Sequence, residues 1–63
     1  MANGLEITRD SLNDFMKIQR YMLLAKEENA TKTYEELKEE YLFLKALLMT
    51  AGVNLTDIDK IKE

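Results

Sequence analysis

Apolar and polar positions follow the period of an α-helix along most of the chain. Between residues 34 and 51 the apolar side chains are separated by steps of three and four residues, at Tyr34, Leu37, Tyr41, Leu44, Leu48 and Ala51. This spacing is typical of a helix that packs along its length against another helix. Thr33 and Glu36 match a capping box at its start, and Gly52 is suited to the left-handed residue that closes a helix. We therefore predict a helix over about 34–51.

A second helical pattern precedes this one. Its stripe recurs at helical spacing and comprises Leu12, Phe15, Met16, Gln19, Met22 and Leu23. Thr8 is suited to be the N-cap, because its hydroxyl can accept a hydrogen bond from a free amide of the first turn. Asn29 marks the end of the pattern. These signals predict a helix over about 9–28 and a flexible N-terminus over residues 1–6.

The last residues carry signals for a short third helix. Asn54 can cap its N-terminus, and Leu55, Ile58 and Ile61 would then share one face. Roughly two helical turns are not stable alone in water, so this helix, over about 55–62, is expected to form only where it docks on another element.

Length and composition agree with one small helical domain. The 63 residues are 46% apolar and 33% charged, and they include no proline, cysteine, histidine or tryptophan. We predict a single all-α domain over residues 1–63, built as an antiparallel helical hairpin with a short C-terminal helix. A chain of this length buries only about 60% of the surface that it exposes when unfolded. Association of the hairpins into a helical bundle is therefore favoured.

The helix predicted over 34–51 carries more apolar surface than one partner helix covers. From residue 41 to residue 51 apolar side chains surround it almost completely, which is typical of a helix buried on several sides. On the preceding helix, Leu24 faces away from the stripe. We predict a self-association interface, with a dimer favoured, made by side chains that the hairpin leaves exposed: Leu24, Leu42, Phe43, Leu47 and Met49.

Candidate catalytic chemistry is sparse. Without histidine the chain lacks the usual general acid or base, and without histidine and cysteine it lacks the usual ligands of zinc and haem and any thiol for redox chemistry. The glutamates between residues 35 and 40 flank Lys38 on the outer side of the predicted helix, where a solvated surface is expected. We predict no enzyme activity, no catalytic residue, no metal and no cofactor.

Charge and hydropathy narrow the class of partner. Nine basic residues are outnumbered by twelve acidic ones, for a net charge of -3, and this balance disfavours a polyanion. The longest nearly apolar run is interrupted by Lys45 and is shorter than the ~20 residues of a membrane span. The first residues lack the pattern of a signal peptide. We expect a cytoplasmic adaptor, inhibitor or assembly component that binds a protein of unknown identity.

One segment supports an alternative function. The apolar skeleton of the segment resembles the helix-turn-helix motif of DNA-binding proteins at Leu47, Ala51, Gly52, Val53, Ile58 and Ile61. The resemblance implies a DNA-binding regulator that uses residues 47–62, with contacts to DNA from Asn54, Thr56, Lys60 and Lys62. Leu48 departs from the small residue usual at its position, and Asp57 and Asp59 oppose binding to phosphates.

Overall fold

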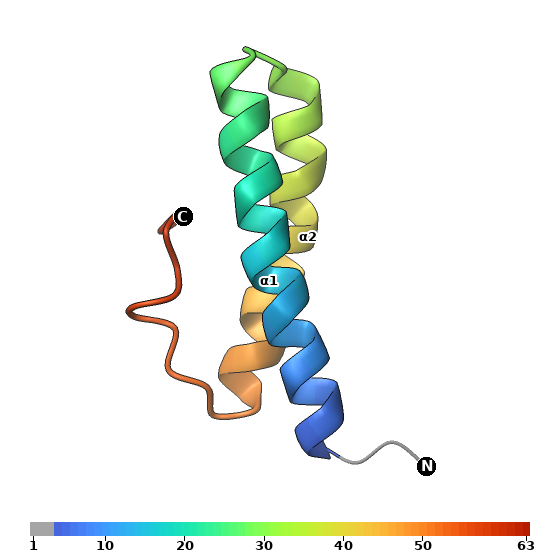
Figure 1. Cartoon of the computed structure of the whole chain (residues 1–63), viewed down its shortest axis with the longest axis vertical. Helices are drawn as coiled ribbons and strands as arrows, with labels where there is room; N and C mark the ends of the chain where they lie inside the picture. Colours follow the sequence, from blue (N-terminus) through green and yellow to red (C-terminus); the bar gives the residue numbers. More distant parts are fainter. Residues whose placement is uncertain (1–3) are drawn as a thin grey trace.

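The chain folds into a helical hairpin with an irregular tail (Figure 1). The computed structural model describes residues 4–63, with side chains from Ile7 onward. Helix α1 spans Gly4–Glu27 and helix α2 spans Thr31–Thr50. The two helices lie antiparallel, and residues 51–63 reverse direction and return along one side of them (Figure 1). The predicted all-α hairpin is confirmed.

The turn between the helices depends on Asn29. Its φ of 57° lies in the left-handed region, which asparagine tolerates better than most residues. The N–H of Asn29 donates to the carbonyl oxygen of Lys26 at 3.1 Å, and the N–H of Ala30 donates to that of Ala25 at 2.8 Å. These two bonds define a Schellman motif. Helix α1 therefore ends within one residue of its predicted end, and Asn29 is the stop that the sequence indicated.

Helix α2 begins three residues before its predicted start. Ala30 occupies the N-cap position without a side-chain hydrogen bond, and its carbonyl oxygen accepts the N–H of Tyr34 at 2.9 Å. Thr33, predicted to be the N-cap, therefore lies inside the helix. The Schellman motif leads directly into the first helical turn, so no separate capping residue is needed.

Helix α1 also begins earlier than predicted, at Gly4. Thr8 was predicted to be the N-cap, but it lies inside the helix. Residues 5–7 include no proline or glycine that would interrupt a helix. Of the N-terminal segment predicted to be flexible, residues 4–6 belong to α1, and residues 1–3 lie outside the described residues.

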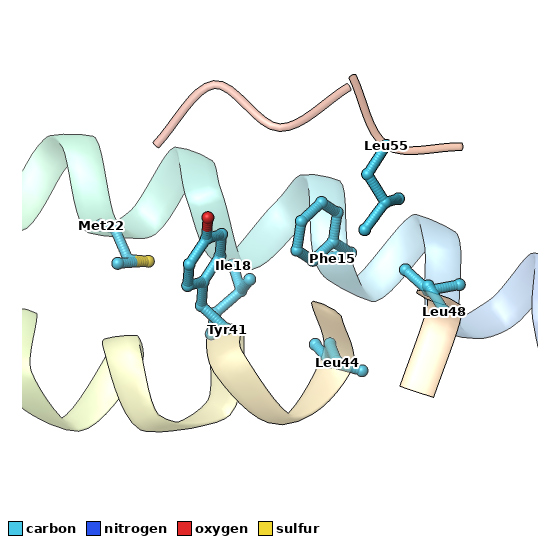
Figure 2. Packing of buried hydrophobic residues seen from close by; sticks show 7 residues of the cluster. All are labelled: Phe15, Ile18, Met22, Tyr41, Leu44, Leu48 and Leu55. Carbon is cyan, nitrogen blue, oxygen red and sulfur yellow. The ribbon is translucent and has the colours of Figure 1, made fainter. Parts of the chain in front are cut away.

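The core lies along the seam between the helices (Figure 2). Phe15 from α1 and Tyr41 from α2 are fully buried and stack with their ring centroids 5.3 Å apart. The buried cluster also contains Leu55 from the tail, which points toward Phe15 (Figure 2). Its complete membership is Phe15, Ile18, Met22, Tyr41, Leu44, Leu48 and Leu55. The buried residues of α2 are therefore members of the predicted seam.

Helix α1 buries a face that overlaps the predicted one but is shifted from it, since Phe15, Gln19 and Met22 of the predicted stripe are buried. Met16 and Leu23, which the prediction placed in the core stripe, are 54% and 49% exposed, whereas Ile18 and Ala25 are buried. Most buried positions of α1 follow alternating steps of four and three residues, at Ser11, Phe15, Ile18, Met22 and Ala25, and the polar Gln19 is buried beside them. This is the spacing that a long contact with one partner helix selects. The prediction included Met16 and Leu23 and left out Ile18 and Ala25, so its stripe was displaced to one side of the face that contacts α2.

Helix α2 ends as predicted, with Gly52 in the left-handed region at a φ of 84°. The N–H of Gly52 donates to the carbonyl oxygen of Met49, and the N–H of Val53 donates to that of Leu48, both at 3.0 Å. These bonds form a second Schellman motif, which leaves the chain free to turn back along the hairpin.

The third helix predicted over 55–62 is not formed. The backbone makes one turn, in which the N–H groups of Ile58 and Asp59 donate to the carbonyl oxygen of Leu55 at 3.0 and 2.8 Å. The turn does not continue because the following N–H groups donate to side chains instead of helical carbonyl oxygens. Gln19 accepts those of Lys60 and Ile61, and Asp59 accepts that of Lys62.

Replacing Leu48 by alanine should lower the free energy of unfolding by about 2–5 kcal/mol, because Leu48 is fully buried and its removal leaves a cavity in the seam. Leu23→Ala is the matched control, since the same atoms are removed from a half-exposed side chain, and its loss should be much smaller. Urea unfolding followed by circular dichroism measures both losses. Equal losses would contradict the assignment of these faces.

Candidate functional site

Polar side chains from both helices hold the tail against one side of the hairpin. We call this set the tail clamp; its members on the helices are Gln19, Lys38, Tyr41 and Lys45. Each of them contacts residues 58–63 of the tail. The clamp thus joins the last part of the chain to the middle of both helices.

Gln19 binds the backbone of the tail. Its side chain is only 3% exposed. Its Nε2 donates to the carbonyl oxygen of Ile58 at 3.2 Å, and its Oε1 accepts the N–H groups of Lys60 at 2.5 Å and Ile61 at 3.1 Å. Since these contacts involve backbone atoms, they constrain the path of the bound segment and not its side chains.

Tyr41 and Lys45 recognise an acidic side chain. The Tyr41 hydroxyl donates to Oδ1 of Asp59 at 2.6 Å, and the Nζ of Lys45 lies 2.8 Å from Oδ2 of the same carboxylate. The Tyr41 hydroxyl also accepts the N–H of Glu63 at 3.2 Å, and Lys45 donates to the carbonyl oxygen of Glu63 at 2.9 Å. Figure 2 shows the hydroxyl of Tyr41 pointing from the core toward the tail.

These contacts determine the ionisation of the clamp. Burial opposes ionisation of Asp59, but hydrogen bonds from Lys45, Tyr41 and the backbone of Lys62 outweigh it and lower the pKa of Asp59. The hydrogen bond to Asp59 raises the pKa of Lys45. Burial, followed by the hydrogen bond to Asp59, raises the pKa of Tyr41. At neutral pH the clamp therefore holds an ionised carboxylate between an ammonium group and a neutral phenol.

Lys38 adds an ion pair at the surface. Its Nζ contacts the side-chain carboxylate of Glu63, and this hydrogen bond raises the pKa of Lys38. Exposed pairs of this kind contribute little to the stability of a fold, because solvent and salt screen them. We therefore expect the main effect of Lys38 to be that the clamp prefers an acidic over a basic side chain at position 63 of the tail.

The groove on the other side of the hairpin has no tail residue in it. Its lining comprises Asp14, Lys17, Ile18, Tyr21, Leu37, Glu40 and Leu44. Phe43 and Leu47 extend this surface along α2, since Leu47 lies one turn beyond Leu44 and Phe43 lies one turn before Leu47. Phe43 is 66% exposed, and Tyr21 and Leu47 are also exposed. We call Tyr21, Phe43, Leu47 and this groove the open face.

All side chains of the predicted interface are exposed in the single chain, but they do not share one face. Phe43 and Leu47 belong to the open face. Met49 instead lines a groove beside the tail, and Leu42, seven residues before it, lies on the same side of α2. Leu24 lies one turn beyond Tyr21 on α1. The structure thus brings Phe43 and Leu47 together and separates them from Leu42 and Met49.

The residues of the DNA-binding alternative lie in the tail. The side-chain oxygen of Asn54 accepts the N–H of Thr56 at 3.0 Å, a local contact that shapes the turn. The backbone N–H groups of Lys60 and Lys62 are bound within the clamp, while their side chains are exposed. The second helix that a helix-turn-helix motif requires after Gly52 is not formed.

The sequence patterns did not predict the tail clamp. Gln19 was assigned to the packing stripe, although an amide within an apolar stripe signals a buried hydrogen-bonding group. Asp59 and Lys45 gave no signal of pairing, because fourteen positions separate them in the chain and only the reversal of the tail brings them together.

Comparison with known proteins adds no relative: no family model, curated protein or solved structure matches this chain. Within the described residues, no helix has both the length and the apolar character needed to cross a membrane. In the same part of the chain, no group of three or more acidic side chains is arranged to hold a metal ion.

Replacing Gln19 by methionine should release the tail while the helices stay folded. The change preserves the size of the side chain but leaves the N–H groups of Lys60 and Ile61 without their acceptor, at a cost of about 1–3 kcal/mol for each group that stays buried. Amide hydrogen exchange should show lost protection at Lys60, Ile61 and also Glu63, which Gln19 does not touch. Arg20→Met, at the adjacent exposed position, is the control. Unchanged protection of the tail would refute the role of Gln19.

The clamp should make stability depend on pH at both extremes. The lowered pKa of Asp59 contributes stability above its unfolded value of ~3.9, and this contribution is lost as the pH falls through the lower, folded value. The raised pKa values of Lys45 and Tyr41 contribute stability below about pH 10, which is lost as the pH rises through the folded values.

Urea unfolding at a series of pH values measures this dependence. Asp59→Asn should be less stable than the wild type near neutral pH and should lose less stability on acidification. Lys45→Met should lose less stability on the alkaline side. If Asp59→Asn and the wild type have the same acid slope, Asp59 is not the group that titrates.

Proposed function

We propose that this protein is a small, non-enzymatic interaction module that associates with a second copy through the open face. It would act as an adaptor, an inhibitor or an assembly component for a further protein. The observation that carries this proposal is the exposure of Phe43, at 66%, one turn before the exposed Leu47 on the side of α2 that the tail leaves uncovered. Aromatic side chains are enriched at interface centres.

The exposed area supports association of two copies. The chain exposes 4901 Å², whereas a compact monomer of 7.4 kDa is expected to expose about 4200 Å². The excess, roughly 700 Å², is close to the ~800 Å² that each partner buries in a stable interface. An excess of this size leaves room for one interface, and the open face is the surface that we propose for it.

The charges around the open face are compatible with pairing between identical surfaces. A two-fold interface places a patch against a copy of itself, so each patch must carry both signs of charge. Lys17 and the carboxylates of Asp14 and Glu40 line the same groove, so Lys17 of one copy can face a carboxylate of the other. Two hairpins joined in this way would form a four-helix bundle with both tails on its outside.

The variant F43Q/L47Q should remain monomeric at concentrations where the wild type is a dimer, because it replaces the exposed apolar side chains of the open face by polar ones. The matched control is L42Q/M49Q, which makes the same kind of change on the tail side of α2 and should still form a dimer. Sedimentation equilibrium measures the masses, and circular dichroism verifies the helices. A folded wild type that stays at 7.4 kDa at high micromolar concentration would overturn the proposal.

A further inference from the structure

We propose that the tail clamp and the groove next to it form a binding site for a short acidic segment of another protein, and that the chain's own tail is a replaceable occupant of this site. The inference rests on the proposed function as an interaction module but not on self-association, because the clamp and the open face lie on different sides of the hairpin.

The bound tail shows what the site recognises. Gln19 makes three hydrogen bonds to the backbone of the tail, at Ile58, Lys60 and Ile61. Tyr41 and Lys45 bind the carboxylate at position 59. Lys38 binds another carboxylate four residues further on. Buried Leu55 and the half-buried Ile58 and Ile61 pack against the core cluster. A ligand would therefore carry apolar side chains at positions equivalent to 55, 58 and 61, and carboxylates at positions 59 and 63.

The tail does not fill the site. A groove remains between it and α1, lined by Met16, Gln19, Arg20, Leu23, Asp57, Ile58 and Lys60. The side chains of Met16 and Leu23 stay about half exposed beside Ile58. A segment with a larger apolar side chain at the position of Ile58 would cover both of them, and it would thereby gain contacts that the tail does not make.

The attachment of the tail permits its release. Apart from the single turn at Leu55, the tail lacks helical structure of its own. It leaves α2 at Gly52, where the space around the α-carbon is open, and glycine can adopt extended as well as left-handed conformations. Rotation within residues 52–54 would swing the tail away and break the capping bond from Val53 to Leu48, while the preceding turns of α2 and all of α1 stay helical.

A segment of another protein is favoured over the tail of a second copy as the occupant of the clamp. The chain's own tail has a high effective concentration at the clamp, equivalent to millimolar for a short connection. The tail of a second copy makes identical contacts and has no such advantage, so it cannot displace the first. Only a segment that fits better, through the groove at Met16 and Leu23, competes effectively.

The test uses the full chain with Asp59→Lys, which places a lysine opposite Lys45 and should release the tail. The probe is a fluorescent peptide with the sequence of residues 53–63. Fluorescence anisotropy should show binding to this variant. A second change, Lys45→Asp, should abolish binding, because the introduced carboxylate would repel the aspartate of the peptide. Absence of binding to the Asp59→Lys chain, with its helices intact, would overturn the proposal.

Enlarging the peptide tests the adjoining groove. The peptide with Ile58→Phe should bind about tenfold more tightly, because phenylalanine would cover Met16 and Leu23. Thr56→Phe, at an exposed position of the tail, is the matched control and should leave the affinity unchanged. Equal affinities for the native and Ile58→Phe peptides would show that the groove is not part of the site.

Two further measurements keep the test decisive. If Asp59→Lys does not fold, the Ile58→Phe peptide is added in excess to the wild type. The peptide should shift the amide resonances of residues 60–63 of the protein to those of a free tail. Unchanged resonances would overturn the proposal. Suppose that F43Q/L47Q still forms a dimer and that the dimer is lost when Asp59→Lys is introduced into the same chain. This result would show that tails exchange between copies, and it would overturn the assignment of the site to another protein. Loss of the wild-type dimer alone would affect only the proposed self-association.

Discussion

Tyr41 connects the two parts of this structure. Its ring stacks on Phe15 at the centre of the helical seam, and its hydroxyl binds Asp59 and the backbone of Glu63 at the edge of the same seam. A buried tyrosine needs a partner for its hydroxyl, and the hairpin alone offers it only Lys45, at 3.5 Å. The tail supplies the shorter bonds, so packing of the core and docking of the tail depend on each other.

The buried carboxylate of Asp59 makes this dependence specific. Removing an ionised group from water costs several kcal/mol, and its pairing with Lys45 and Tyr41 offsets that cost without a large surplus. An apolar residue at position 59 would pack against the helices in more than one register. The requirement that a carboxylate meet both Tyr41 and Lys45 allows one register, which Gln19 then fixes through the backbone. Such a cluster contributes more to selectivity than to stability.

The sequence predicted several parts of the fold that depend on local signals, although the N-caps at Thr8 and Thr33, which are local signals too, were wrong. The seam of α2, the left-handed ending at Gly52 and the turn at Asn29 all follow from residue type and spacing, because each is decided within a few residues. The face of α1 and the form of the tail could not be obtained in this way. Met16 and Leu23 have the hydrophobicity of core residues, and only the position of α2 makes them peripheral. Residues 55–62 have the pattern of a helix, but Gln19 and Asp59 take the N–H groups that a helix would use.

A hairpin of two helices has two grooves, and among the described residues the tail fills one of them. The tail covers the side of Gln19 and Lys45, where polar contacts compensate for limited apolar area. The other side, with Phe43 and Leu47, offers apolar area and few polar constraints. A surface of the first kind discriminates among ligands, since a wrong side chain at position 59 leaves a buried charge or hydroxyl unpaired. A surface of the second kind gives affinity with less selectivity and suits contact with an identical copy, whose local concentration rises with expression of the protein itself. This division of the hairpin into a selective polar side and a less selective apolar side is the physical basis for the two partners that we propose.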